Sequence, residues 1–91
     1  MIRKGSRGEL ISVAQVRAAR GLLGWSQADL AGAASVSVPS IKRLEGRGAI
    51  KVSNDVRVAV RWALEREGVE FIEPNGGGVG VRLKKAKPRR R

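Results

Sequence analysis

The spacing of apolar residues predicts four helices followed by two strands. Val16, Ala19 and Leu23 recur at helical intervals. Ser12 precedes them as a helix-capping residue, and Gly24 follows them as a stop. The first helix is therefore expected between these two residues.

Two serines predict the starts of the next two helices. Ser26 precedes a helix over 27–34, and Ser37 precedes a helix that reaches Glu45. Pro39 is tolerated in the first turn, where backbone N–H groups have no partner inside the helix. A tight turn through Ser35 and the valine after it separates the two helices.

The last third of the chain predicts a longer helix and a β-hairpin. The helix begins at Ser53 or Asn54 and ends at Gly68, with an apolar core stripe that includes Val60 and Leu64. The segments 69–72 and 79–83 have the residue types of short strands, and the glycine-rich stretch 74–78 between them is typical of a turn.

Val58 and Trp62 form a second apolar patch on a different face of the fourth helix. A hairpin is marginally stable alone, so it either folds back over Trp62 or pairs with a second subunit. The sequence favours a two-fold dimer built from the hairpin. The expected interface residues are Val58, Trp62, Val69, Phe71, Ile72 and Val81.

The charge of the chain is concentrated at its ends. The chain has 91 residues and a net charge of +11, yet between Gly8 and Val81 nine basic residues face eight acidic ones. Basic tails usually contact a polyanion or else remain solvated. The residues expected to contact the phosphate backbone of such a polyanion are Arg3, Lys4, Arg7, Lys84, Lys85, Lys87, Arg89, Arg90 and Arg91.

The composition argues against catalysis, metal binding and membrane insertion. The chain has no cysteine and no histidine, which removes thiolate zinc sites and the commonest general base. No apolar run is long enough to span a bilayer. We expect a cytoplasmic protein, of bacterial or phage type, that is not an enzyme and that has no metal, cofactor or small-molecule ligand.

The window from Gln27 to Glu45 carries the functional signal. Two helices joined at a steep angle by a short turn need apolar residues at the positions of Leu30, Ile41 and Leu44, with polar residues outside. The stretch GLLGWSQADLAGAASVSVPSIKRLE resembles the Cro/C1-type (XRE) family of helix-turn-helix DNA-binding regulators. The resemblance covers about residues 12–67.

The resemblance implies that the third helix enters the major groove of DNA and that Gln27 contacts a phosphate and braces this helix. It also implies that Arg20 and Glu45 form a pair tying the first helix to the third. The expected DNA-binding residues are Gln27, Ser37, Val38, Pro39, Ser40, Lys42, Arg43 and Arg47.

The chain departs from the family pattern in two places. Ser35 stands where the family usually has glycine, at a cost of roughly 1 kcal/mol for a left-handed residue. Val38 and Pro39 stand where hydrogen-bonding base readers are common. Direct reading is therefore expected to fall to Arg43, with help from Lys42, and guanine is the natural target of either.

The sequence thus predicts a mostly α fold, a small four-helix domain with a C-terminal β-hairpin and basic disordered tails. Its expected parts are an arm over 1–11, a helix-turn-helix domain over 12–67, the hairpin over 68–83 and a tail over 84–91. The expected function is a sequence-specific transcriptional regulator, acting as a homodimer on a two-fold symmetric DNA site. An architectural DNA binder and an autoregulatory, antitoxin-like interaction protein are the alternatives.

Overall fold

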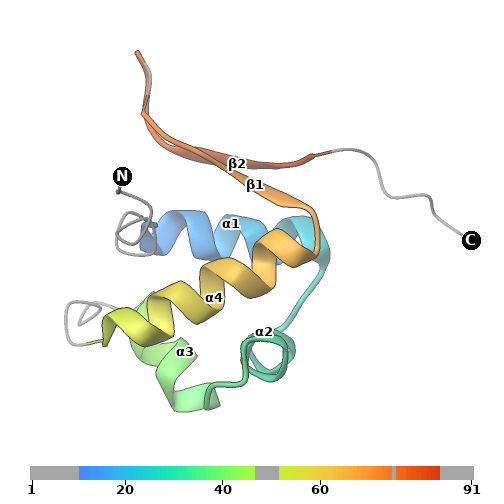
Figure 1. Ribbon diagram of the computed structural model, residues 1–91, viewed down its shortest axis with the longest axis vertical. Coiled ribbons are helices and arrows are strands. Elements are labelled where there is room, and N and C mark those ends of the chain that lie inside the picture. The colour runs from blue at the N-terminus through green and yellow to red at the C-terminus, as the bar shows by residue number, and fades with distance from the viewer. Residues whose placement is uncertain (1–10, 47–51, 75, 85–91) are drawn as a thin grey trace, which may run out of the picture.

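The computed structural model describes residues 11–46, 52–74 and 76–84. In this part of the chain four helices precede one antiparallel hairpin (Figure 1). They are α1 (Val13–Leu23), α2 (Gln27–Ala34), α3 (Val38–Glu45), α4 (Asn54–Arg66), β1 (Val69–Ile72) and β2 (Gly80–Leu83). The small, mostly helical architecture with a C-terminal hairpin is therefore confirmed. The predicted disorder of the basic tails falls almost wholly on residues outside the described ones.

Serine side chains begin all four described helices, as the sequence indicates. The hydroxyl of Ser12 accepts a hydrogen bond from the backbone N–H of Gln15 at 3.0 Å, and the Gln15 side chain accepts one from the Ser12 N–H at 2.9 Å. Ser26 and Asp29 repeat this reciprocal arrangement at the start of α2. A cap of this kind contributes about 1 kcal/mol. The four N-cap residues are Ser12, Ser26, Ser37 and Ser53.

The first two helices end in the same way but on different residues. Gly24 closes α1 with φ 70°, and Ser35 closes α2 with φ 59°. In both, the next N–H reaches back to a carbonyl in the last helical turn, Trp25 to Arg20 and Val36 to Ala31, each at 3.0 Å. Both ends therefore need a left-handed residue, although only glycine adopts that conformation without a steric cost.

The core lies where all four helices and β1 meet. Apolar side chains from each element are almost fully enclosed, which removes their surface from water and supplies most of the driving force for folding. The largest of these side chains are Val16, Leu30, Ile41, Leu44, Val60, Leu64 and Val69.

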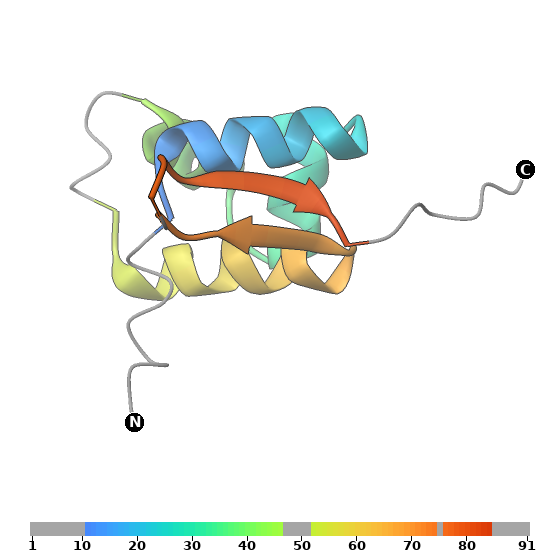
Figure 2. The same cartoon turned by 90° about the horizontal axis from the view of Figure 1, so that it is seen from above.

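The hairpin packs across α1 and α4. Figure 2 shows β2 beside α1 and β1 beside α4. The register pairs Val69 with Leu83 and Phe71 with Val81, and these side chains pack against the core. The side chain of Gln15 in α1 donates a hydrogen bond to the Gly80 carbonyl at 2.9 Å, which fixes β2 on this helix.

The packing of the hairpin corrects two expectations. Val69 and Phe71 are only 1% and 8% exposed within a single chain, so their side chains belong to the chain's own core rather than to a dimer interface. The hairpin does not cover Trp62 either, since this side chain is 61% exposed. Ile72 and Val81 are half-buried. Association of two subunits stays a prediction.

Two element boundaries also differ from the expected ones. Helix α4 ends at Arg66 instead of Gly68, because Gly68 has φ 97° and turns the chain into β1. Strand β2 begins at Gly80 instead of Val79, which is 43% exposed. The backbone N–H of Lys84 donates to the Gly68 carbonyl at 2.7 Å and closes the base of the hairpin.

Candidate nucleic-acid interface

Helix α3 has a buried side and an exposed side with different chemistry. Its inner residues Ile41 and Leu44 are at most 1% exposed, and both belong to the core. Lys42 and Arg43 are exposed on the outer side, together with Pro39 at the first turn. Because the single acid of α3, Glu45, is buried, the outer side presents positive charge alone.

Hydrogen bonds order the first turn of α3. The Ser37 hydroxyl accepts from the Ser40 backbone N–H at 3.1 Å and shares a second hydrogen bond with the Ser40 hydroxyl at 2.9 Å. Pro39, in the first turn, removes an N–H that would have no intrahelical partner. The Ser40 hydroxyl is therefore already hydrogen-bonded to the capping residue, and the Ser40 side chain is half-buried.

The last turn of α3 is attached to α1 and α2 through Glu45. The Arg20 guanidinium donates two hydrogen bonds to this carboxylate, Nε to Oε2 and Nη2 to Oε1, both at 2.8 Å. Gln27 Nε2 donates a third to Oε1 at 3.1 Å, and Arg17 Nε lies 4.0 Å away. The pair of Arg20 and Glu45 that the family resemblance implies is thus present, and Gln27 does brace α3.

Burial and charge act in opposite directions on the Glu45 carboxyl. Its side chain is 4% exposed, and this burial works to raise its pKa. The hydrogen bonds from Arg20 and Gln27, together with the charges of Arg20 and Arg17, outweigh burial and hold the pKa below its ordinary value. The carboxylate is therefore ionised at neutral pH, where it fixes the orientation of α3.

Val38 contributes less to the outer surface than expected. Its side chain is half-buried and packs against the core, in contrast to its exposed neighbour Pro39. Neither side chain hydrogen-bonds. Among the described residues of α3, the exposed charged side chains are Lys42 and Arg43.

The expected tail contacts lie mostly outside the described residues. This holds for Arg47 and for the tail residues Arg3, Lys4, Arg7, Lys85, Lys87, Arg89, Arg90 and Arg91. Lys84 is described and exposed at the base of the hairpin. Contact of these residues with DNA stays a prediction.

The sequence pattern does not predict the burial of one charged residue in α4. Arg61 in α4 is 5% exposed, donates from Nε to Glu65 at 2.9 Å and lies 4.7 Å from the centroid of the Phe71 ring. The spacing of Arg61 and Glu65, four residues apart, signals an ion pair on one helix face. Burial came from β1 packing over that face, which the spacing does not encode.

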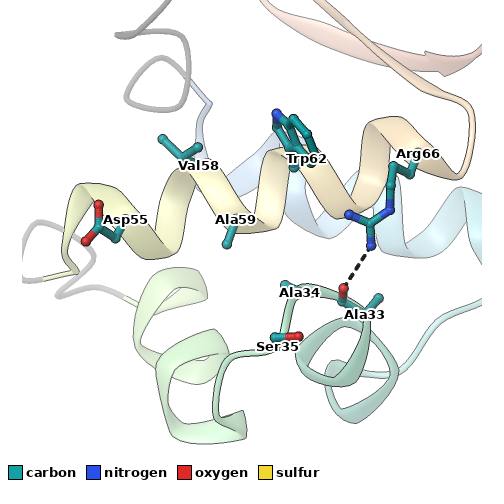
Figure 3. Close-up of a pocket in the computed structure, with 8 residues that line it drawn as sticks. All are labelled: Ala33, Ala34, Ser35, Asp55, Val58, Ala59, Trp62 and Arg66. Carbon is teal, nitrogen blue, oxygen red and sulfur yellow. Dashed lines mark hydrogen bonds between the residues drawn. The ribbon is translucent and has the colours of Figure 1, made fainter.

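A groove runs between the C-terminal end of α2 and α4 (Figure 3). Its volume is about 510 Å³. It is lined by Ala33, Ala34, Ser35, Asp55, Val58, Ala59, Trp62 and Arg66. Arg66 Nη2 donates to the Ala33 carbonyl at 3.1 Å and joins the two helices at one end. These lining residues include one acid and one base and form no cluster of catalytic or metal-ligating groups.

Within the described ranges, no three His, Cys, Asp or Glu residues are grouped so that they could hold a metal ion. None of the helices in the same ranges combines the length and the apolarity that crossing a membrane requires. Comparison with family models, curated proteins and solved structures finds no match to this chain.

Proposed function

We propose that this protein binds double-stranded DNA as a sequence-specific transcriptional regulator, with α3 in the major groove and with two copies on a two-fold symmetric site. The observation that supports this most strongly is the outer side of α3. Lys42 and Arg43 are exposed there, and no acid of α3 accompanies them. A helix of this width fits the major groove, and phosphates and base edges attract its cations.

Arg43 is the proposed base reader. A guanidinium donates two parallel hydrogen bonds to the O6 and N7 atoms of guanine, which no other base pair accepts in the same geometry. Lys42 carries a point charge without this fork, so it suits a phosphate or a single acceptor. Each half-site therefore contains at least one guanine that Arg43 reads.

The buried network at Glu45 supports the proposal in a second way. Base reading is tighter when the helix that carries the reading side chains is already fixed before DNA arrives, because ordering the helix on binding costs affinity. Arg20 and Gln27 hold the end of α3 through Glu45, and Ser37 holds its start. The exposed cations therefore project from a helix that is fixed at both ends.

Selection from a random pool of duplex DNA with the purified full chain tests the proposal. The expected result is one enriched motif with two-fold symmetry, bound roughly 10³-fold or more tightly than random DNA at physiological salt. Absence of binding to any duplex contradicts the proposal. Enrichment of an asymmetric motif contradicts the two-copy arrangement while leaving DNA binding intact.

An architectural DNA binder is the second candidate, and the apolar first turn of α3 favours it. Pro39 offers no hydrogen bond, and Val38 is partly taken up by the core. In that mode, the six basic residues from Lys84 to Arg91 dominate binding. Random and selected DNA would then be bound within about tenfold of each other, well below the ratio of a specific regulator.

Removing residues 84–91 separates the two modes. Neutralising six phosphates contributes a slope of about −5 to the plot of log affinity against log salt concentration. The truncated regulator should show a shallower slope but keep its preference for the selected motif. The truncated architectural binder should lose most of its affinity for every duplex.

A further inference from the structure

Helix α4 presents a stripe of residues along the groove whose tryptophan and two charged members are exposed, while its alanine, Ala59, also packs against the core. Asp55, Ala59, Trp62 and Arg66 follow one another at intervals of four, three and four residues, which places them along one side of the helix. Figure 3 shows all four along the groove beside α2, with Val58 next to them. We call Asp55, Ala59, Trp62 and Arg66 the α4 stripe.

The exposure of Trp62 is the unusual feature of this stripe. A tryptophan side chain removes roughly 150–250 Å² of surface from water when it is covered. Here the side chain is 61% exposed beside the groove, although the hairpin covers other parts of α1 and α4. Tryptophan is enriched at protein–protein interfaces and among the residues that contribute most to their affinity.

We propose that the α4 stripe is the contact surface for a second copy of this chain, with the two α4 helices packed antiparallel about a two-fold axis. The intervals of four, three and four read the same in both directions. Reversal therefore places Asp55 opposite Arg66 of the partner subunit and Ala59 opposite Trp62 of the partner subunit. The stripe of one subunit is therefore complementary to the same stripe of the other, as a two-fold interface requires.

The antiparallel arrangement places opposite charges against each other. At the two ends of the stripe, about 16 Å apart along the helix axis by the rise per residue, a carboxylate meets a guanidinium. Parallel packing would instead place Asp55 against Asp55 and Arg66 against Arg66, and both contacts would be repulsive. Arg66 already gives one hydrogen bond to Ala33, and its guanidinium retains other N–H donors for a carboxylate.

The antiparallel arrangement also places a large side chain against a small one. The largest side chain of the stripe, Trp62, lies opposite one of the smallest, Ala59. The groove beside Ala59 is lined on the α2 side by Ala33 and Ala34, which leave the space that an indole occupies. Each subunit therefore supplies one indole and one groove, and the interface holds two copies of the same contact.

The oligomeric state of the full chain without DNA tests the pairing. Sedimentation equilibrium at roughly 50 μM should show a dimer, because a dissociation constant in the micromolar range is typical of a modest interface. Trp62→Ala should raise the dissociation constant on the order of a hundredfold, as removal of a central aromatic anchor does. The far-ultraviolet circular dichroism should keep its helical signal. A wild-type monomer at this concentration would overturn the proposal.

Mixing two charge variants tests the antiparallel arrangement itself. Asp55→Lys alone places a cation opposite Arg66, and Arg66→Glu alone places an anion opposite Asp55, so neither variant should dimerise. In an equimolar mixture, the introduced cation of one chain meets the introduced anion of the other, and the unchanged Arg66 and Asp55 meet at the opposite end. A heterodimer should therefore form. Glu73→Lys and Lys84→Glu make the same charge changes off the stripe and should dimerise like the wild type.

Any other interface gives a different pattern. If the edge of the hairpin joins the subunits, both charge variants remain dimers and Trp62→Ala has little effect. If the variants stay monomeric when mixed, the antiparallel pairing is wrong. Because no DNA is present in these measurements, they remain informative even if the proposed DNA binding fails.

Discussion

The outer side of α3 and the α4 stripe are two helix surfaces of the same small molecule that differ in charge and in apolar content. On α3 the exposed charges, Lys42 and Arg43, have one sign and no apolar neighbour of the size of Trp62. On α4 an exposed indole lies between one acid and one base. A one-sign surface suits a polyanion, whereas a surface with both signs around an apolar centre suits a protein.

The two surfaces also differ in how they are held. The outer side of α3 depends on a buried ion pair that reaches α1 and α2. The α4 stripe depends on ordinary core packing, with Val60 and Leu64 buried on the other side of the helix and Ala59 itself packed against the core. Changes to the network at Glu45 should therefore disturb α3 first. Changes to Trp62 should leave both the fold and α3 intact.

Arg20→Ala should have the largest effect, because it removes the contact that holds the outer side of α3 in place. Without Arg20 the Glu45 carboxylate, 4% exposed, loses two charge-assisted hydrogen bonds and keeps the one from Gln27, at a cost of about 3 kcal/mol in the free energy of unfolding. Chemical denaturation of both proteins at neutral pH measures it. Arg17→Ala is the control, since this arginine is 63% exposed and 4.0 Å from Glu45, and its loss should cost less than about 1 kcal/mol. Equal losses in the two variants would contradict the assigned role of Arg20.

Arg43→Ala should affect one surface only. It should weaken binding to the selected DNA by about 1–3 kcal/mol and relax the preference at one base pair, while dimerisation without DNA stays unchanged. Fluorescence anisotropy with matched and singly altered duplexes measures both parts. Arg82→Ala removes the same charge from the hairpin and should not change base preference. A folded Arg43→Ala variant with full affinity and unchanged preference would exclude Arg43 as the reader.

Acidification should loosen α3 through Glu45. Because the folded-state pKa of this carboxyl lies below its ordinary value of 4.5, its ionised form stabilises the fold above that pH. This contribution is lost as the pH falls through the lowered value. Glu45→Gln should therefore be less stable than the wild type at pH 7, with the difference shrinking as the pH is lowered below 4.5. Urea denaturation at several pH values measures it, and a difference that does not depend on pH would contradict the argument.

Ser35→Gly should have the smallest effect and leave both surfaces unchanged. Ser35 has φ 59°, and glycine adopts this conformation without the clash of a Cβ atom. The free energy of unfolding should rise by up to about 1 kcal/mol. Gly24→Ser, at the matching end of α1 with φ 70°, should lower it by a similar amount. Thermal unfolding of the two variants measures the pair, and a shift of the same sign in both would show that the turn geometry is not the cause.

Much of the fold follows from local patterns that the sequence displays directly. Serines followed by a helical apolar spacing located four helix starts, because an N-cap needs only residues within the first turn. The inner positions of α3 followed from the same spacing. The contact between Arg20 and Glu45, 25 residues apart, came from the family resemblance and not from any local pattern.

The placement of the hairpin shows where sequence reasoning stops. Alternation correctly indicated two strands, and the structure pairs them from Val69 to Leu83. The same alternation gives each strand an apolar side without saying whether the chain's own helices or another subunit covers it. The sequence alone therefore predicts Val69 and Phe71 at a dimer interface, whereas in the structure they complete the core over α1 and α4.

The sequence by itself thus determined the helix starts, the turn residues, the strand segments and the excess of positive charge, since all of these depend on near neighbours along the chain. Only the tertiary structure decided which apolar faces are covered. It buries Val69, Phe71 and Arg61 and leaves Trp62 exposed beside the groove with Asp55 and Arg66. The physical reason is that burial depends on how α1, α4 and the hairpin pack in three dimensions. Helical spacing identifies the apolar faces of a helix but does not tell which of them other elements cover.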